Sequence, residues 1–210
     1  LYEFVGLATT GGTSTAQAQD VFKFNYTTND YKELLKDPNV DLIGISTQHN
    51  SHAKFVVEAL KAGKSVYCEK PLCLTTEQLD QIEEVYNESK GQLFVGLNRR
   101  HAPLIKQIKK DLKTDTIPAV YDYIANAGFI PENHWTQDES KGGGRIIGEA
   151  IHFVDTIMYL DNILRNPNRF IINEEEIVKV EQARRITVES IKHLSKHTNF
   201  IQEIEDNGDV

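Results

Sequence analysis

Short apolar runs and amphipathic stretches alternate three times between residues 40 and 97. The apolar runs cover residues 41–46, 65–69 and 92–97. Local features mark the ends of the amphipathic stretches: Gly63 stands where a left-handed residue closes a helix, and Thr75 with Gln78 forms a capping box. Strands that alternate with helices across short turns predict a parallel sheet with helices on its faces.

The part of the chain before residue 60 extends the same pattern. Its expected elements are strands at residues 3–8 and 22–26, a helix that Asp30 and Glu33 open and that ends at Leu35, and a helix capped by Ser51. Because the sequence starts at Leu1 and enters a strand-like run at once, we expect a first strand to be missing. The prediction is an α/β fold in which residues 1–100 form a Rossmann-like nucleotide-binding domain, truncated at its N-terminus, whose parallel sheet lacks the first strand.

The acidic composition argues against several kinds of partner. The 31 acidic and 23 basic residues give a net charge of −8, which repels nucleic-acid phosphates and anionic membrane surfaces. No apolar stretch is long enough to span a bilayer, and the first residues lack a signal-peptide pattern, so we expect a cytoplasmic protein without nucleic-acid or membrane partners. Cys68 and Cys73 have no second pair with which to form a zinc site, so we expect two packing residues and no metal.

Polar residues directly follow each of the three apolar runs. They are Ser46-Thr47-Gln48-His49-Asn50, Glu69-Lys70-Pro71 and Asn98-Arg99-Arg100. In a parallel α/β sheet ligands bind beyond the carboxyl ends of the strands, so we expect the three groups to converge on one crevice. We also expect the Lys70–Pro71 bond to be cis, which would turn the Lys70 side chain into that crevice. The alternative, a solvated loop at Glu69 and Lys70, stays open on spacing alone.

A second polar cluster follows three consecutive glycines, Gly142–Gly144. The glycines permit a close backbone approach before a helix start, and from Arg145 onward the pattern is helical. The polar side of this helix is expected to hold Arg145, Glu149, His152, Asp155, Thr156 and Tyr159. One face would thus present His152 with two carboxylates, although a lone histidine on a helix is more often a surface residue or a hydrogen-bonded core residue.

Both clusters carry a resemblance to a known family. The stretches AGKSVYCEKPLCLTTEQL, FVGLNRRHAPL and GGGRIIGEAIHFVD resemble the glucose-fructose oxidoreductase, inositol dehydrogenase and rhizopine catabolism (Gfo/Idh/MocA) family of NAD(P)-dependent dehydrogenases. The resemblance covers residues 28–160, and NRRHAPL and NAGFIPENHW are most similar to members associated with bacterial surface-sugar biosynthesis. It implies hydride transfer between a nicotinamide cofactor and a hydroxyl carbon of a sugar, cyclitol or nucleotide sugar.

The resemblance also implies roles for the catalytic residues. His152 would take the hydroxyl proton as a general base, while Lys70 would hydrogen-bond the same oxygen and stabilise the charge that develops on it. The family commonly has an aspartate four residues before this histidine, where the present sequence has Gly148. Either Glu149 takes over the acid role or the protein manages without it.

The cofactor is expected to be NAD or NADP, but the usual phosphate loop is absent. No G-x-G-x-x-G motif occurs in the sequence, and the glycines of FVGLATTGGTSTAQ are misplaced for one. That stretch is either an atypical phosphate-binding loop or, on the preferred alignment with the family, the second strand of the sheet. In the second case Thr9 would lie beside the adenosine ribose. Thr9 carries no charge that would decide between NAD and NADP. The further cofactor contacts implied by the resemblance are Ser46, Thr47, Asn50, His52, Glu69, Lys70 and Asn98.

The substrate is expected to contact the second half of the chain. The candidate contacts are Arg99, Arg100, His134, Trp135 and Asp155, among which the tryptophan offers an apolar face to a sugar ring and the arginines bind carboxylate or phosphate. The resemblance implies that residues 101–210 form an α+β substrate and oligomerisation domain with a mainly antiparallel sheet. Only residues 117–128 read as a strand and residues 174–194 as a helix, so this domain is expected to lack its central strands.

Two functions stay open on the sequence. The first is a dehydrogenase that acts on a small sugar-type substrate and forms a homo-oligomer through the second-domain sheet. The second is a non-catalytic relative or partner subunit that has lost cofactor binding. The absent glycine motif favours the second function, whereas the presence of both Lys70 and His152 favours the first. Because the missing first strand carries the phosphate loop, we expect the 210 residues alone to be poorly active or inactive.

Overall fold

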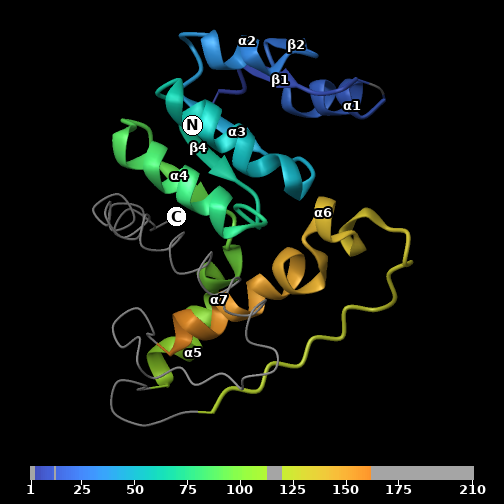
Figure 1. Ribbon diagram of the computed structural model, residues 1–210, viewed down its shortest axis with the longest axis vertical. Coiled ribbons are helices and arrows are strands. Elements are labelled where there is room, and N and C mark those ends of the chain that lie inside the picture. Colours follow the sequence, from blue (N-terminus) through green and yellow to red (C-terminus); the bar gives the residue numbers. More distant parts are fainter. Residues whose placement is uncertain (1–2, 12, 113–119, 162–210) are drawn as a thin grey trace.

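The computed structural model describes residues 3–11, 13–112 and 120–161 (Figure 1). Up to residue 97 short strands alternate with helices, as the sequence predicts. The strands are β1 (Gly6–Ala8), β2 (Tyr26–Thr28), β3 (Leu42–Ile45), β4 (Ser65–Cys68) and β5 (Leu93–Val95). The helices between them are α1 (Thr13–Phe22), α2 (Tyr31–Lys36), α3 (His49–Lys61) and α4 (Thr76–Glu88).

The strands form two parallel sheets among the described residues. In one sheet β1 pairs with β2, and in the other the order is β3-β4-β5, with Leu42 opposite Ser65 and Val66 opposite Leu93. One parallel strand placed between β1 and β3 would produce the doubly wound order 3-2-1-4-5-6 of nucleotide-binding folds. The predicted Rossmann-type arrangement is therefore confirmed, and the break between the two sheets lies where the first strand of that order belongs.

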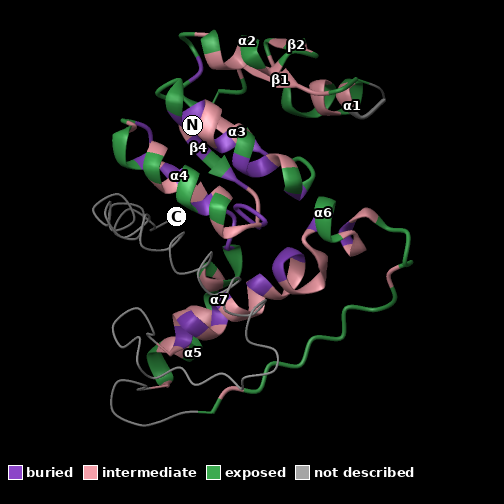
Figure 2. Cartoon of the chain, viewed as in Figure 1, coloured by how far each residue is buried: buried purple, intermediate pink, exposed green. Residues whose placement is uncertain are grey.

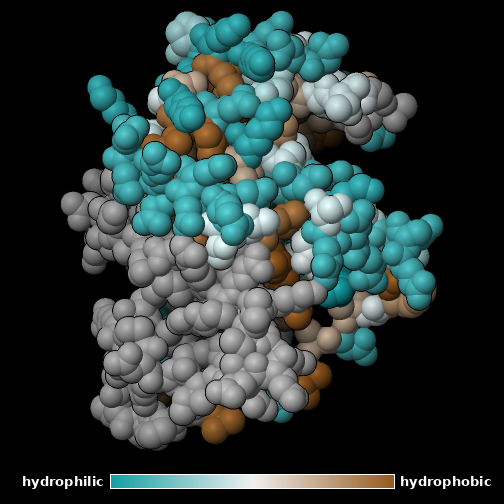
Figure 3. All heavy atoms as spheres, in the orientation of Figure 1, coloured by the Kyte–Doolittle hydropathy of each residue, from teal (hydrophilic) through white to brown (hydrophobic). Residues whose placement is uncertain are grey.

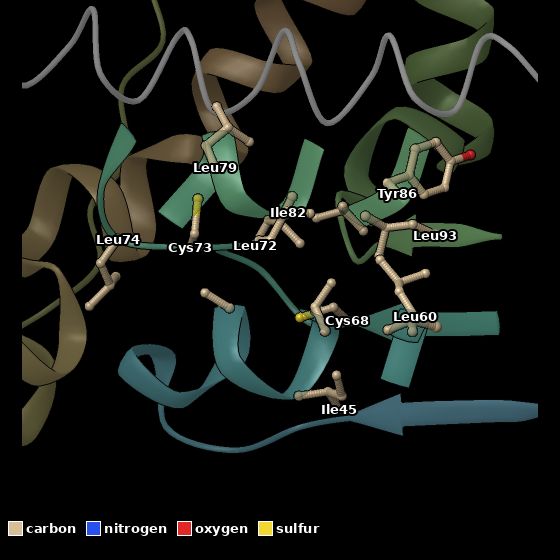
Figure 4. Close-up of a cluster of buried hydrophobic side chains, with 14 of the residues drawn as sticks. Ile45, Leu60, Cys68, Leu72, Cys73, Leu74, Leu79, Ile82, Tyr86 and Leu93 are labelled. Atoms are coloured by element: carbon tan, nitrogen blue, oxygen red, sulfur yellow. The ribbon is translucent and has the colours of Figure 1, made fainter. Parts of the chain in front are cut away.

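The hydrophobic core lies between the three-stranded sheet and the helices α3 and α4 (Figure 4). Val66 and Cys68 stand two residues apart on β4, so both point to the face that the helices cover, and neither is exposed. Tyr67 between them points to the opposite face and is partly exposed. Leu60 of α3 and Leu79 of α4 are buried members of the same cluster. Figure 3 shows hydrophilic side chains over the visible surface near α4 and a mixture of hydrophilic and apolar side chains near α3.

Helix ends agree with the local sequence in most places. Thr75 and Gln78 form the predicted capping box at α4, and Gly63 has the predicted left-handed backbone after α3, with φ of 75°. Asp30 caps α2, but it does so by accepting a hydrogen bond from the Lys32 amide and not through the expected capping box with Glu33. The cap at Ser51 was wrong, because α3 begins at His49 and the Ser51 hydroxyl lies within its first turn, where it donates to the Gln48 carbonyl.

The strand predicted at residues 22–26 begins later than expected. Phe22 ends α1, and Lys23 takes a left-handed backbone conformation with φ of 56° before β2 starts at Tyr26. The apolar residues of this stretch pack locally, since the rings of Phe4, Phe22 and Phe24 contact one another at centroid distances of 5.2 to 6.2 Å. Their alternation therefore reflects an aromatic cluster and not a strand.

The two cysteines are buried and free, as the sequence predicts for packing residues. Burial raises the pKa of the Cys73 thiol to about 12, and it raises the pKa of the Cys68 thiol further still. Both side chains therefore stay protonated and unreactive at neutral pH.

The described residues after 97 form short helices and one long extended segment. The helical elements are η1 (Asn98–His101), α5 (Pro103–Asp111), η2 (Trp135–Gln137), α6 (Glu139–Gly142), the π-helical turn η3 (Ile146–Ala150) and α7 (Ile151–Leu160). The expected helix after the glycines is thus present, but it starts at Ile146 with a π-helical turn. No helix among the described residues has both the length and the apolar character needed to cross a membrane.

The strand predicted at residues 117–128 is not formed over its described part. Residues 120–130 are extended but form no β-pairing with another described segment, and Val120, Ile124 and Phe129 are strongly exposed. Alternating apolar residues form a strand only when a neighbouring strand takes up their backbone hydrogen bonds. Residues 117–119 and the predicted helix at 174–194 lie outside the described residues, so the antiparallel sheet, the oligomer through it and the domain boundary at residue 100 remain predictions.

Candidate active site

The carboxyl ends of β3, β4 and β5 bring three polar loops to one edge of the sheet. The three strands are parallel, so residues 46–48, 69–71 and 98–100 all follow strand ends on the same side. Ser46, Thr47 and Asn98 are exposed there. The predicted convergence of the three loops is confirmed at the level of the sheet, and it leaves polar groups open to a ligand at the edge where α/β sheets bind them.

Lys70 connects this edge to the segment after the triple glycine. Its ammonium Nζ donates to the carbonyl oxygen of Gly148 at 2.7 Å and lies 3.1 Å from Oε1 of Glu149. The Lys70 side chain is 14% exposed and that of Glu149 is 35% exposed, so the pair is partly shielded from water. The Lys70–Pro71 bond is cis, as predicted. Lys70 is therefore not a solvated loop residue, because its amine is bound by a segment 79 residues further along the chain.

His152 lies on α7, three residues after Glu149, and shares the electrostatic environment of Lys70. Burial lowers the pKa of His152, and the positive charges of Lys70 and Arg99 lower it further, against the opposing effect of Glu149 and Glu69. Its Nδ1 is buried and has no hydrogen-bond partner among the described residues. The imidazole is thus held neutral at neutral pH beside a fixed ammonium group, which is the state that a general base requires.

Position 148 has no room for a side chain. A Cβ atom there would come within 2.5 Å of the Gly142 carbonyl oxygen and 3.3 Å of Nδ1 of His49. An aspartate four residues before His152 would therefore need the backbone to move. The carboxylate near Lys70 comes instead from Glu149, within the π-helical turn, a local geometry that is frequent at functional sites.

Two histidines on the first turn of α3 bind backbone carbonyls at this edge. Nδ1 of His49 contacts the Gly142 carbonyl oxygen at 2.8 Å, and the ring meets Trp135 edge-on at a centroid distance of 4.8 Å. Burial lowers the pKa of His49 more than its bond to Gly142 raises it, so a neutral ring donates to the carbonyl. The sequence analysis placed His49 in the polar group after β3 but gave it no role of its own, although its spacing of three from His52 puts both rings on one helix face.

His52 is buried between two of the strand-end loops. Its Nδ1 lies 2.7 Å from the Pro71 carbonyl oxygen and its Nε2 lies 3.0 Å from the Thr47 carbonyl oxygen. Both ring nitrogens thus face the protein's own backbone. The predicted contact of His52 with a cofactor stays a prediction that this placement does not favour.

Asp155 differs from its expected position on an open polar face. The carboxylate is fully buried and forms a bidentate ion pair with Arg100. The Arg100 guanidinium also lies 5.5 Å from the centre of the Tyr159 ring. Burial raises the pKa of Asp155, and Arg100 opposes that shift. The helical spacing suggested exposure, but a buried carboxylate is stable when an arginine neutralises it. Arg100 and Asp155 hold η1 against α7, and neither offers a free charge to a substrate.

The other predicted substrate contacts are spread over the second half of the chain. Arg99 is exposed, donates to the Tyr123 hydroxyl at 3.1 Å and lies 4.9 Å from the Phe153 ring. His134 is exposed and bonds Thr136 through Nδ1 at 2.8 Å, while Trp135 packs against His49. Arg99 therefore stands one residue from Asn98 at the sheet edge, and Trp135 is connected to that edge through His49.

The predicted cofactor contacts divide between the two sheets. Thr9 follows β1, and its hydroxyl lies 3.3 Å from the Gly11 amide. Glu69 follows β4, and its Oε1 accepts from the Tyr67 hydroxyl at 3.1 Å. A Cβ on Gly96 would come within 2.9 Å of the Glu69 carboxylate, so Gly96, which sequence reasoning missed, leaves the space that this carboxylate fills.

The remaining polar groups at the edge are open. Asn50 and Asn98 are exposed, and the Thr47 hydroxyl contacts the Ser51 hydroxyl at 2.6 Å. Within the described part of the chain no group of three histidine, cysteine, aspartate or glutamate residues is placed to hold a metal ion. The chemistry available at this edge is therefore that of an ammonium group, a neutral imidazole and two carboxylates.

Comparison with known proteins agrees with this geometry. Residues 1–97 match the family model described as an oxidoreductase family with an NAD-binding Rossmann fold. The chain is 34% identical over 142 residues to inositol 2-dehydrogenase/D-chiro-inositol 3-dehydrogenase of Lactiplantibacillus plantarum. This alignment covers 65% of this chain and 38% of that protein. It is 38% identical over 133 residues to myo-inositol 2-dehydrogenase of Thermotoga maritima, and this alignment covers 62% of this chain and 39% of the relative.

Solved structures show the same fold. A levoglucosan dehydrogenase in complex with NADH and levoglucosan superposes with a TM-score of 0.63 at 26% identity, covering 75% of this chain and 44% of that protein. The chain therefore spans about two fifths of the length of the curated relatives that it matches.

Proposed function

We propose that the chain is a member of the Gfo/Idh/MocA oxidoreductase family, whose model matches residues 1–97, and that the protein of which it forms part is an NAD(P)-dependent dehydrogenase for a sugar or cyclitol. The observation that carries the proposal is the placement of the Lys70 amine, Glu149 and a neutral His152 at the carboxyl edge of a parallel sheet. Ammonium and imidazole groups at one site suit the removal of a proton from a hydroxyl group.

The residues at this edge fit one end of a nicotinamide cofactor. Ser46, Thr47 and Asn98 leave exposed polar groups beside Glu69 and Lys70, as a ribose and a carboxamide require. The sequence has no glycine fingerprint for the pyrophosphate, so no described residue is assigned to it. When bound, the nicotinamide exchanges a hydride with the hydroxyl carbon of the substrate.

Lys70 is the residue that binds and polarises the substrate oxygen. An ammonium group has three N–H donors, and Gly148 and Glu149 take two of them in the structure. These two contacts fix the orientation of the third N–H group. We assign this N–H group to the substrate, where it donates to the hydroxyl oxygen that loses its proton. The positive charge lowers the energy of the alkoxide character that develops on this oxygen.

His152 takes the proton during oxidation and returns it during reduction. Its Nδ1 is buried, so proton exchange with the substrate falls to Nε2. Its lowered pKa keeps the ring unprotonated at neutral pH, and Glu149 offsets part of the repulsion that proton uptake creates between His152 and Lys70. The proposal therefore assigns Glu149 to charge balance and not to direct proton transfer.

The substrate class rests on the relatives and on the open side chains. The matched relatives are named for inositols and levoglucosan, which are polyhydroxylated rings. Trp135 is available as an apolar platform and exposed Arg99 and His134 as polar contacts. A nucleotide sugar is the finer alternative, because Arg99 would serve equally well for a phosphate.

A second candidate function is a non-catalytic partner subunit. Such a subunit would keep the Rossmann-type fold and have lost cofactor binding. The two functions differ in nucleotide binding, because only the dehydrogenase requires saturable binding of NADH or NADPH to the full-length protein.

The test uses the full-length protein with NAD and NADP and a panel of myo-inositol, levoglucosan and D-xylose. We expect saturable quenching or enhancement of NADH or NADPH fluorescence and reduction of the cofactor with at least one polyol. Lys70→Ala should lower kcat by about 10²- to 10³-fold, and Lys90→Ala, an exposed lysine at the opposite end of β5, should not. Binding of neither nucleotide would end the dehydrogenase proposal.

A further inference from the structure

His52 occupies a position where it can fix the backbone that carries Lys70. It lies on the buried face of α3 and is 1% exposed. The Thr47 carbonyl belongs to the loop after β3 and the Pro71 carbonyl to the loop after β4, and the imidazole lies between them at 3.0 and 2.7 Å. One ring thus connects the ends of two neighbouring strands at the candidate active site.

Lys70 has a backbone anchor on each side. Before it, the Glu69 amide donates to the Ile45 carbonyl at 2.9 Å, which continues the pairing of β4 with β3. After it, the Pro71 carbonyl is held by His52, and Leu72 and Cys73 are fully buried in the core. Lys70 itself is left to reach outward to Gly148 and Glu149. Its side-chain direction is therefore set by the anchors on its neighbours.

We propose that His52 is a positioning residue that holds the Lys70 loop in place, and this inference rests on the catalytic role proposed for Lys70. Proline has no N–H, so the Pro71 segment cannot fix itself by donating a backbone hydrogen bond at that residue. Its carbonyl needs a donor from elsewhere, and Nδ1 of His52 supplies one. His52 acts on the substrate only through Lys70.

Lysine reactivity provides a readout that a purely structural role would not change. The Lys70 amine is mostly shielded and engaged by two partners, so it should react slowly with acetic anhydride in the full-length protein. The extent of acetylation is measured by mass spectrometry of the peptide that contains Lys70, with exposed Lys90 as the internal reference. The measurement requires no turnover.

Three variants separate positioning from stability. His52→Phe keeps a ring but removes both ring nitrogens, and His52→Gln keeps an amide N–H that can donate to one carbonyl. Val56→Ala is the matched control, since Val56 lies on the same helix, is fully buried in the core and has no polar side-chain atom that could bind a loop carbonyl. We expect the phenylalanine variant to raise Lys70 acetylation about tenfold and the glutamine variant to raise it less.

The control should lower the melting temperature but leave Lys70 acetylation within about twofold of wild type. Equal acetylation of Lys70 in wild type, His52→Phe and His52→Gln would overturn the inference, as would an equal rise in Val56→Ala. If His52→Phe does not fold, the glutamine variant decides alone. In the active protein, His52→Gln should lower kcat more than it raises KM. Absence of turnover in wild type would refute the proposed function, whereas the acetylation result tests the positioning role separately.

Discussion

Residues 3–39 and residues 40–97 have the same kinds of element but very different packing. None of the side chains described between residues 3 and 39 is buried, and Phe4 and Phe22 are about half exposed. In contrast, residues 40–97 contain most of the fully buried side chains, which Figure 2 shows concentrated in α3, β4 and α4. A two-stranded sheet has too little surface to bury a core, whereas three strands under two helices can do so.

This difference in packing shows which part of the candidate active site is supported by a hydrophobic core. Lys70 and His52 belong to the well-packed region, and Lys70 also contacts the segment that leads into α7. Thr9, the predicted ribose contact, belongs to the region without a core. Lys70, which is proposed to bind the substrate hydroxyl, thus lies in the well-packed region. Thr9, the predicted contact of the cofactor ribose, does not.

The largest expected effect extends the comparison beyond residue 97, to a buried ion pair that has an exposed counterpart in residues 3–39. Arg100→Leu leaves the buried Asp155 carboxylate without its partner, so it should lower the free energy of unfolding by about 3 to 5 kcal/mol. Lys23→Ala removes the exposed pair with Asp20 and should cause no measurable change. Urea unfolding of both variants tests the contrast, and equal effects would remove it.

A smaller contrast is expected for leucines. Leu79→Ala opens a cavity in the core beneath α4 and should cost about 3 kcal/mol. Leu7→Ala in β1 removes a side chain that is only partly buried and should cost less than about 1 kcal/mol. Chemical denaturation of the two variants measures both values, and a larger loss at Leu7 would mean that residues 3–39 are packed as well as the core.

Gly148→Ala tests how closely the backbone at residue 148 approaches Gly142 and His49 of α3. The new Cβ would overlap the Gly142 carbonyl, so the variant should lose about 1 to 3 kcal/mol of stability and weaken the contact of Lys70 with the Gly148 carbonyl. Gly44→Ala is the control, because a Cβ there meets nothing within 4 Å. Thermal unfolding compares the variants, and equal melting temperatures would show that the backbone at residue 148 is free to move.

The smallest expected effect concerns pH. The pKa values of His49 and His152 are lowered in the folded protein, chiefly by burial, from the ordinary value of 6.5. The unfolded chain therefore binds more protons as the pH falls through that value, so stability should be complete above it and should decrease below it. His152→Gln should flatten the decrease between about pH 7.5 and about pH 5.5. A melting temperature with the same pH dependence in both proteins would contradict this account.

The parts of the fold that could be predicted depend on neighbours in sequence. Thr75 with Gln78, Gly63 and the polar loop at Lys70 are all local patterns, and each is found in the expected place. The errors concern partners that are distant in sequence. The spacing of the helix after Gly144 cannot reveal that Asp155 meets Arg100, 55 residues away.

The same limit applies to the candidate site. The roles of Lys70 and His152 were identified through the family resemblance, whereas the role of His49 was not foreseen, because its partner, the Gly142 carbonyl, is 93 residues away. The role of Gly148 also depends on a close approach that no periodicity reveals. The strand at residues 117–128 failed for a related reason, since pairing requires a second segment that alternation does not specify.

The most direct test of the central claim is a double-mutant cycle on kcat/KM in the full-length protein, with Lys70→Ala, His152→Ala and the double variant. If the amine and the imidazole act on the same substrate oxygen, removal of either abolishes most of the benefit of the other. We therefore expect the double variant to be within about threefold of the slower single variant. Losses that multiply, so that the double variant falls by the product of the two single effects, would show that the two groups act independently and would contradict the account.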